Sequence, residues 1–111
     1  AIGGEILLKW IDILRPECVF VPDVWEDKNA SIRNAKEWSQ YILPEEVTKV
    51  AIVQAKSKGE ALECTQTYKD LGYKKIAYIY GSSFYNNIAQ HPNENIGKAL
   101  GRVYMISHFY F

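Results

Sequence analysis

Three residues that could bind a small molecule come directly after three short apolar runs of the chain. Asp23 follows residues 18–22, Gln54 follows residues 50–53, and Gly81 follows residues 75–80. A carboxylate accepts hydrogen bonds from N–H groups or acts as a base, and a carboxamide offers a donor and an acceptor together. A glycine turn can present backbone N–H groups to a carbonyl oxygen or an anion. The paired donor and acceptor of the Gln54 carboxamide suit the edge of a purine or pyrimidine ring.

The order of apolar runs and helical patterns indicates how these residues are positioned. Segments with helical spacing separate the three runs, so the chain reads as strand–helix–strand–helix–strand. In parallel α/β folds the ligand site lies at the carboxyl ends of the strands. We therefore expect an α/β fold with adjacent parallel strands near residues 18–23, 50–54 and 75–80. Asp23, Gln54 and Gly81 should then gather at one end of the sheet.

Capping signals place the helices around these strands. Pro16 ends a first helix over residues 5–14, and Asp27 or Asn29 can cap the second. Ser57 and Glu60 have capping-box spacing, and Gly72 suits the left-handed end of that third helix. Residues 81–93 predict a long loop. The stripes expected to be buried are Ile6, Leu7, Trp10, Ile11 and Leu14; Ile32, Ala35, Trp38 and Ile42; Ala61, Leu62, Thr65, Tyr68 and Leu71; and the amphipathic set Ile96, Leu100, Val103 and Ile106.

Each candidate site residue also has a structural interpretation. Asp23 could cap a helix or hold the loop of residues 25–27. Gln54 either bonds to neighbouring backbone or faces a ligand, because a buried amide without partners costs about 1–3 kcal/mol. The turn at Gly81 is of a kind that many proteins share. The sequence leaves these alternatives open.

Length and charge limit the function classes. The 111 residues make one domain at most, and 13 basic and 13 acidic residues give a net charge of zero, without the strong basic surface typical of nucleic-acid binding. Three parallel strands leave edges that need partners. We therefore expect residues 1–111 to be a single α/β segment of a larger catalytic domain. Its edges would be covered by the rest of that domain or by self-association.

Several other site types are not indicated. Cys18 and Cys64 lack metal or redox spacing and read as buried small residues in a reducing compartment, which predicts a cytoplasmic protein. His91 and His108 have no partner at metal-ligand spacing. No P-loop, dinucleotide fingerprint or nucleophile elbow occurs, and no signal peptide or membrane span is visible. We expect no cofactor in this segment and no membrane partner.

Five pieces of the sequence resemble the central part of the tRNA-guanine transglycosylase family, most closely its phage and bacterial deazaguanine relatives. They are residues 13–16 (ILRP), 19–24 (VFVPDV), 50–54 (VAIVQ), 71–77 (LGYKKIA) and the glycine at 81. The resemblance implies a (β/α)₈ TIM-type barrel that exchanges guanine in tRNA or DNA for a 7-deazaguanine. Asp23 would accept hydrogen bonds from the base, and Gln54 and a backbone N–H near Gly81 would donate to its ring carbonyl.

The resemblance has departures. Ala55 stands where the family has glycine, and the interval from Asp23 to Gln54 is short. The family's nucleophilic aspartate and zinc-binding cysteines lie further along the chain, so zinc is implied only for a full-length protein, and the isolated chain should be inactive. Two alternatives remain. One is a fragment of another TIM-barrel or flavodoxin-like enzyme, and the other is a non-catalytic α/β interaction module whose interface is its C-terminal helix, which runs into the aromatic residues 109–111. A downstream aspartate and a C-x-C-x-x-C cluster would favour the transglycosylase.

Overall fold

The computed structural model describes the backbone of residues 2–110 and the side chains of residues 4–108. It confirms an α/β fold with one sheet of three parallel strands in the order β1-β2-β3. The elements are α1 (Ile2–Leu14), β1 (Cys18–Phe20), α2 (Lys28–Ser39), β2 (Thr48–Val53), α3 (Lys58–Asp70), β3 (Lys75–Tyr78), α4 (Phe84–Ala89) and α5 (Glu94–Tyr110). The strands alternate with helices along the chain, as the sequence predicts.

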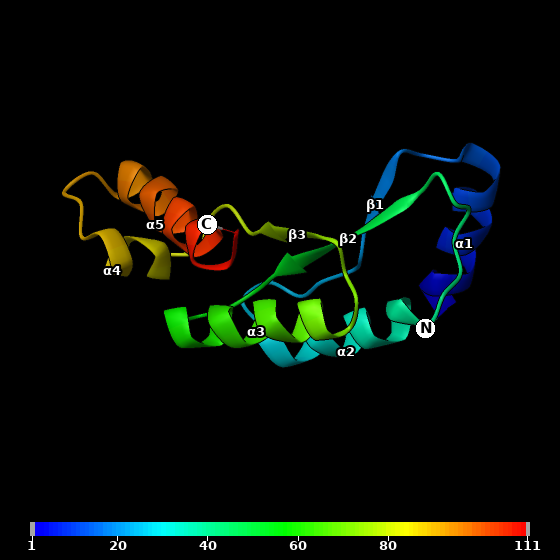
Figure 1. The fold of residues 1–111 in the computed structure, drawn as a ribbon, viewed down its shortest axis with the longest axis horizontal. Helices are drawn as coiled ribbons and strands as arrows, with labels where there is room; N and C mark the ends of the chain where they lie inside the picture. Colours follow the sequence, from blue (N-terminus) through cyan, green and yellow to red (C-terminus); the bar gives the residue numbers. More distant parts are fainter. Residues whose placement is uncertain (1, 111) are drawn as a thin grey trace.

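Figure 1 shows α2 and α3 together on one face of the sheet, with no helix over the opposite face. The contacts of β2 define the two faces. Lys49 reaches the carboxyl end of α2, so Ala51 and Val53 also point toward the helices, and both are buried. Val50 and Ile52 therefore point to the open face. There Val50 pairs with Phe20, whose side chain is 62% exposed.

The predicted helix caps are confirmed. The Asp27 carboxylate accepts from Ala30 N–H at 2.9 Å at the start of α2, and Ser57 Oγ accepts from Glu60 N–H at 3.2 Å at the start of α3. Gly72 follows α3 with a φ of +95°, a left-handed conformation that glycine adopts without steric cost. Short, well-capped helices therefore return the chain to the amino end of each next strand.

The prediction of a loop over residues 81–93 is wrong, because this segment contains α4. Phe84 and Tyr85 are buried and Ile88 packs against the core, so three apolar side chains within two turns drive helix formation. Asn86 and Asn87 mask this pattern in the sequence. The Asn86 side chain instead bonds His91, accepting from its N–H at 3.0 Å and donating to its carbonyl oxygen at 3.1 Å.

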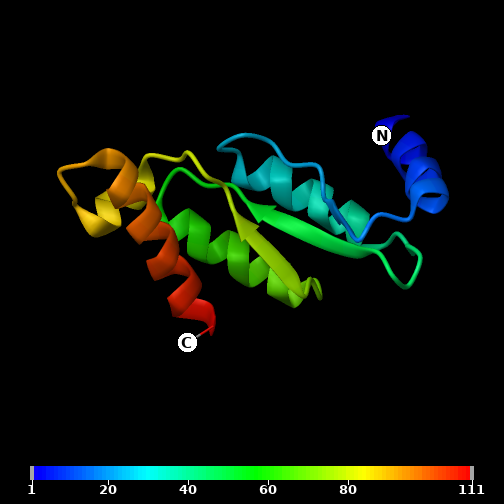
Figure 2. The same cartoon turned by 90° about the horizontal axis from the view of Figure 1, so that it is seen from above.

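Two of the predicted apolar stripes are exposed. In α1, Ile11 is buried, but Ile6, Leu7, Trp10 and Leu14 face outward. Ile42, in the second predicted stripe, falls after α2 and is also exposed. In α5 the exposed set is Ile96, Leu100, Val103 and Ile106. Figure 2 shows α1 and the α4–α5 pair at opposite ends of the sheet, where neither α1 nor α5 covers a sheet face.

The face of α5 that packs against α4 carries glycines and not the apolar stripe. A Cβ on Gly97 would collide with the Asn86 side chain, and one on Gly101 would collide with the backbone carbonyl of Tyr85. Met105, one turn further, is fully buried. The two helices therefore approach closely along a face that hydropathy does not reveal. The aromatic residues 109–111 lie outside the described side chains, so their predicted interface role stays a prediction.

We expect Gly101→Ala to lower the free energy of unfolding by about 1–3 kcal/mol, because a methyl group there overpacks the α4–α5 contact. Urea denaturation measures this change. Gly59→Ala is the matched control, since a Cβ at this helical position meets only Ser57 Oγ at 4.0 Å. The control should be neutral or stabilising by up to about 1 kcal/mol. Equal stability of the two variants would contradict the packing.

Candidate functional site

The structure places Asp23, Gln54 and Gly81 just beyond the carboxyl ends of β1, β2 and β3, as the strand order predicts. Two of them touch: Gln54 Nε2 donates to Asp23 Oδ2 at 2.5 Å. Gly81 joins the group through Trp25, since a Cβ on Gly81 would lie 3.2 Å from Trp25 Cη2. Residues that are far apart in the chain therefore form one surface.

The Gln54 side chain is already satisfied by protein groups. Besides its bond to Asp23, its Oε1 accepts from Glu26 N–H at 2.9 Å. The residue is 2% exposed, whereas Asp23 is only partly buried. Of the two alternatives for this amide, the structure therefore shows a bond to neighbouring backbone, together with the bond to Asp23.

Hydrogen bonds from three side chains hold the turn after β1 in place. Ser31 Oγ accepts from Val24 N–H at 3.0 Å and donates to Val24 O at 3.2 Å. Glu26 has a φ of +50°, which is uncommon for a residue with a side chain, and Gln54 holds its N–H. Asp27 provides the cap of α2. Asp23 is therefore not the cap, and its carboxylate remains partly exposed beside this ordered turn.

The electrostatics of the site leave the Asp23 charge without a cationic partner. Among residues 4–108, no lysine, arginine or histidine forms an ion pair with it. Lys28, at the start of α2, pairs with Glu63 at 2.5 Å instead, and this hydrogen bond raises the pKa of the Lys28 ammonium. The only hydrogen bond to the Asp23 carboxylate within the described side chains comes from the neutral Gln54 amide.

Buried polar groups from α3 lie directly under Gln54. The Cys64 thiol lies near the Gln54 backbone, and its pKa is raised chiefly by burial. Burial also raises the pKa of the Tyr68 phenol, with further contributions from Cys64 and the Asp23 charge. Tyr68 Oη donates to Ile52 O at 2.9 Å. These groups are neutral at physiological pH and support the end of β2.

Trp25 is a site residue that the sequence patterns did not single out. Its ring lies against Gly81, yet the residue is 56% exposed. An exposed aromatic face of this kind can stack on a flat ring. Its position two residues after a strand-end aspartate is the signal that could have identified it.

Two buried hydroxyls follow Gly81. Ser82 Oγ and Tyr85 Oη have no hydrogen-bond partner within the described part of the chain. Buried hydroxyls are normally satisfied by protein or by ordered water. Ordered water is the partner we expect for these two hydroxyls.

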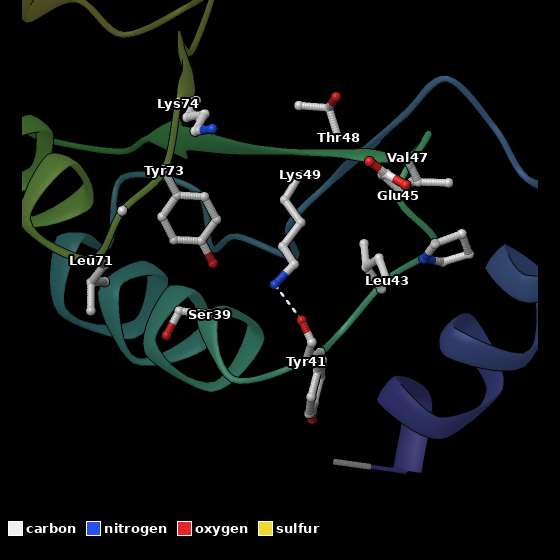
Figure 3. A pocket seen from close by; sticks show the side chains of 12 residues that line it. Ser39, Tyr41, Leu43, Glu45, Val47, Thr48, Lys49, Leu71, Tyr73 and Lys74 are labelled. Atoms are coloured by element: carbon white, nitrogen blue, oxygen red, sulfur yellow. Dashed lines mark hydrogen bonds between the residues drawn. The ribbon is translucent and has the colours of Figure 1, made fainter.

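Another pocket lies at the opposite, amino end of the strands (Figure 3). It has a volume of about 350 Å³ and lies between the segments that lead into β2 and β3. Lys49 points into it and donates to Trp38 O at 2.7 Å and Tyr41 O at 2.5 Å. Burial lowers the pKa of this lysine. Because its ammonium caps the end of α2, we assign Lys49 a structural role.

A second hollow, also of about 350 Å³, lies beside the candidate site. Trp25 and Glu26 form one wall and Lys56 and Glu60 another, but Asp23 and Gln54 do not line it. The Asp23 carboxylate therefore belongs to an open surface in this structure, not to a closed cavity.

Within residues 2–110, no group of three His, Cys, Asp or Glu side chains is placed to hold a metal ion, and no helix has the length and apolar character to cross a membrane. The zinc that the resemblance implies therefore has no ligand set in this part of the chain, and no chemical step is derived through it. Comparisons of the chain with protein-family models, with curated proteins and with solved structures found no match.

The burial of Cys64 predicts unequal thiol reactivity. Cys18 is partly exposed, whereas Cys64 is fully buried with a raised pKa. We expect a thiol reagent at neutral pH to modify Cys18 at least about tenfold faster than Cys64, because the thiolate is the reacting form. Cys18→Ser and Cys64→Ser variants assign the two phases. Equal rates for the two thiols in the folded protein would show that Cys64 is not buried beside Gln54 as described.

Proposed function

We propose that this chain forms part of a (β/α)₈ barrel enzyme that binds guanine or a 7-deazaguanine for base exchange in tRNA or DNA. The observation that supports it best is the convergence of Asp23, Gln54 and Gly81 at the carboxyl ends of adjacent parallel strands. These are the positions on which the resemblance to tRNA-guanine transglycosylases rests. Ligand sites of parallel α/β enzymes occur at this end of the sheet.

The chemistry of Asp23 fits the Watson–Crick edge of guanine. That edge presents a ring N–H and an exocyclic amine side by side, and a carboxylate can accept from both. Adenine has a ring acceptor in place of the N–H and would face the carboxylate with a lone pair. The negative charge of Asp23 is not balanced by a cation within the described side chains, so it remains available to these donors.

The Gly81 turn would supply the complementary donor. No residue within 2–110 accepts a hydrogen bond from the Gly81 N–H. An N–H at this place could donate to the ring carbonyl of the base. Trp25, which lies against Gly81, would offer an aromatic face to the same ring.

The open face of the sheet favours a barrel. Both α2 and α3 lie on one face, as the outer helices of a (β/α)₈ barrel do (Figure 1). The other face carries Phe20, Val50 and Ile52, a set of side chains suited to a barrel interior. The remaining strands of the barrel, or a second copy of the chain, would cover this face and the strand edges. The alternatives of another barrel enzyme and of an interaction module share this requirement.

We expect Asp23→Asn to reduce guanine exchange about ten- to a hundredfold in the full-length protein. Once the bound base covers Asp23, the loss of this charged acceptor costs about 1.5–3 kcal/mol, while a strand-end side chain contributes little packing. Incorporation of radiolabelled guanine into tRNA and into DNA measures the effect. The isolated 111-residue chain should show no turnover, because it lacks a residue that matches the family's nucleophile.

Asp27→Asn is the matched control for this assay. It removes a carboxylate from the same loop, but asparagine caps a helix as well as aspartate does, so α2 and the exchange rate should be unchanged. Equal incorporation by wild type and Asp23→Asn would remove Asp23 from the site. No incorporation by the wild type into either nucleic acid would count against the proposed family.

A further inference from the structure

The orientation of the Gln54 amide is fixed by its neighbours. Its Nε2 faces Asp23 Oδ2 at 2.5 Å, and its Oε1 faces the Glu26 N–H at 2.9 Å. A rotation by half a turn would set its oxygen against the carboxylate and its NH₂ group against an N–H. Both contacts would be repulsive, so only one orientation satisfies both neighbours.

The geometry also separates Gln54 from a ligand. The residue is 2% exposed, and both ends of its amide bond to residues of the turn that follows β1. Asp23, which is only partly buried, is the more accessible of the pair. A ligand that drew the Gln54 amide toward itself would break the bonds to Asp23 and Glu26 together.

We infer that Gln54 is a positioning residue, which holds the Asp23 carboxylate and the Trp25 turn in the arrangement that receives the base. The ring carbonyl of the base is then bound by the backbone N–H at Gly81, and not by Gln54 as the sequence alone suggested. This inference rests on the proposed function for the identity of the ligand. It concerns the bonds of Gln54, which can be measured without any ligand.

Two substitutions separate the two hydrogen bonds of Gln54. Gln54→Glu keeps an oxygen for the Glu26 N–H but replaces the donor to Asp23 by a second carboxylate. Two carboxylates in contact share one proton, which they retain to a higher pH than an isolated carboxyl group. Gln54→Leu has a similar size and removes both bonds.

Nuclear magnetic resonance of the labelled protein tests positioning without a ligand. In Gln54→Glu the Asp23 carboxyl carbon should titrate jointly with the new carboxylate, and hydrogen exchange at the Glu26 amide should stay close to that of the wild type. In Gln54→Leu that exchange should accelerate. An Asp23 titration that is the same in wild type and Gln54→Glu would overturn the inference.

Binding of guanine and of 6-thioguanine, which keeps the ring N–H and the amine but has a weakly accepting sulfur in place of the carbonyl oxygen, tests the division of roles. We expect Gln54→Glu to weaken both ligands by the same factor, about tenfold near pH 8, because each meets Asp23 through the same ring N–H and amine. Binding should recover near pH 5, where the carboxylate pair holds a proton. A clearly larger loss for guanine would show that Gln54 reaches the carbonyl and would overturn the inference.

The measurements without a ligand and the binding measurements together distinguish this inference from the proposed function. If the wild-type protein binds neither purine, the proposed ligand is wrong. The titration of Asp23 and the exchange of the Glu26 amide then decide by themselves whether Gln54 positions the carboxylate.

Discussion

The Gln54 carboxamide is the interaction on which the rest of the site depends. Gln54 directly follows β2, and its side chain reaches across to Asp23 and Glu26 after β1. The backbone at Glu26 is left-handed, so this turn needs an external acceptor to hold its N–H. One neutral side chain thus fixes the acceptor of the site and the turn that carries Trp25.

Much of this arrangement could be predicted from the sequence because it follows from topology. Three apolar runs separated by helical segments predict adjacent parallel strands, and the residue after each strand must then lie at the same end of the sheet. That reasoning correctly brought together Asp23, Gln54 and Gly81. It could not show that Gln54 bonds to Asp23, because the direction of a side chain beyond a strand depends on the turn opposite it. The packing of Trp25 on Gly81 depends on that same turn.

The helices show what hydrophobic periodicity alone could not predict, namely which face of each helix packs against the rest of the protein. A stripe such as Ile96, Leu100 and Val103 indicates a helix but not which face packs. Close packing of α5 uses Gly97 and Gly101 instead, because only residues without a side chain allow the backbone of α4 to approach. In α4, two asparagines break the apolar pattern of a short helix. Exposed stripes on α1 and α5 and an open sheet face are surfaces that apolar partners would cover.

The partner of Asp23 also restricts the kind of ligand. A carboxylate paired with arginine or lysine would be neutralised and would attract anions to the same place through the cation. Asp23 is held by an amide, and the cation closest in sequence, Lys28, is bound to Glu63. A phosphate or carboxylate ligand would meet an uncompensated negative charge at this surface, at a cost that grows as water is excluded. A neutral ring with two adjacent N–H donors meets a matching acceptor, so charge and geometry favour the same class of ligand.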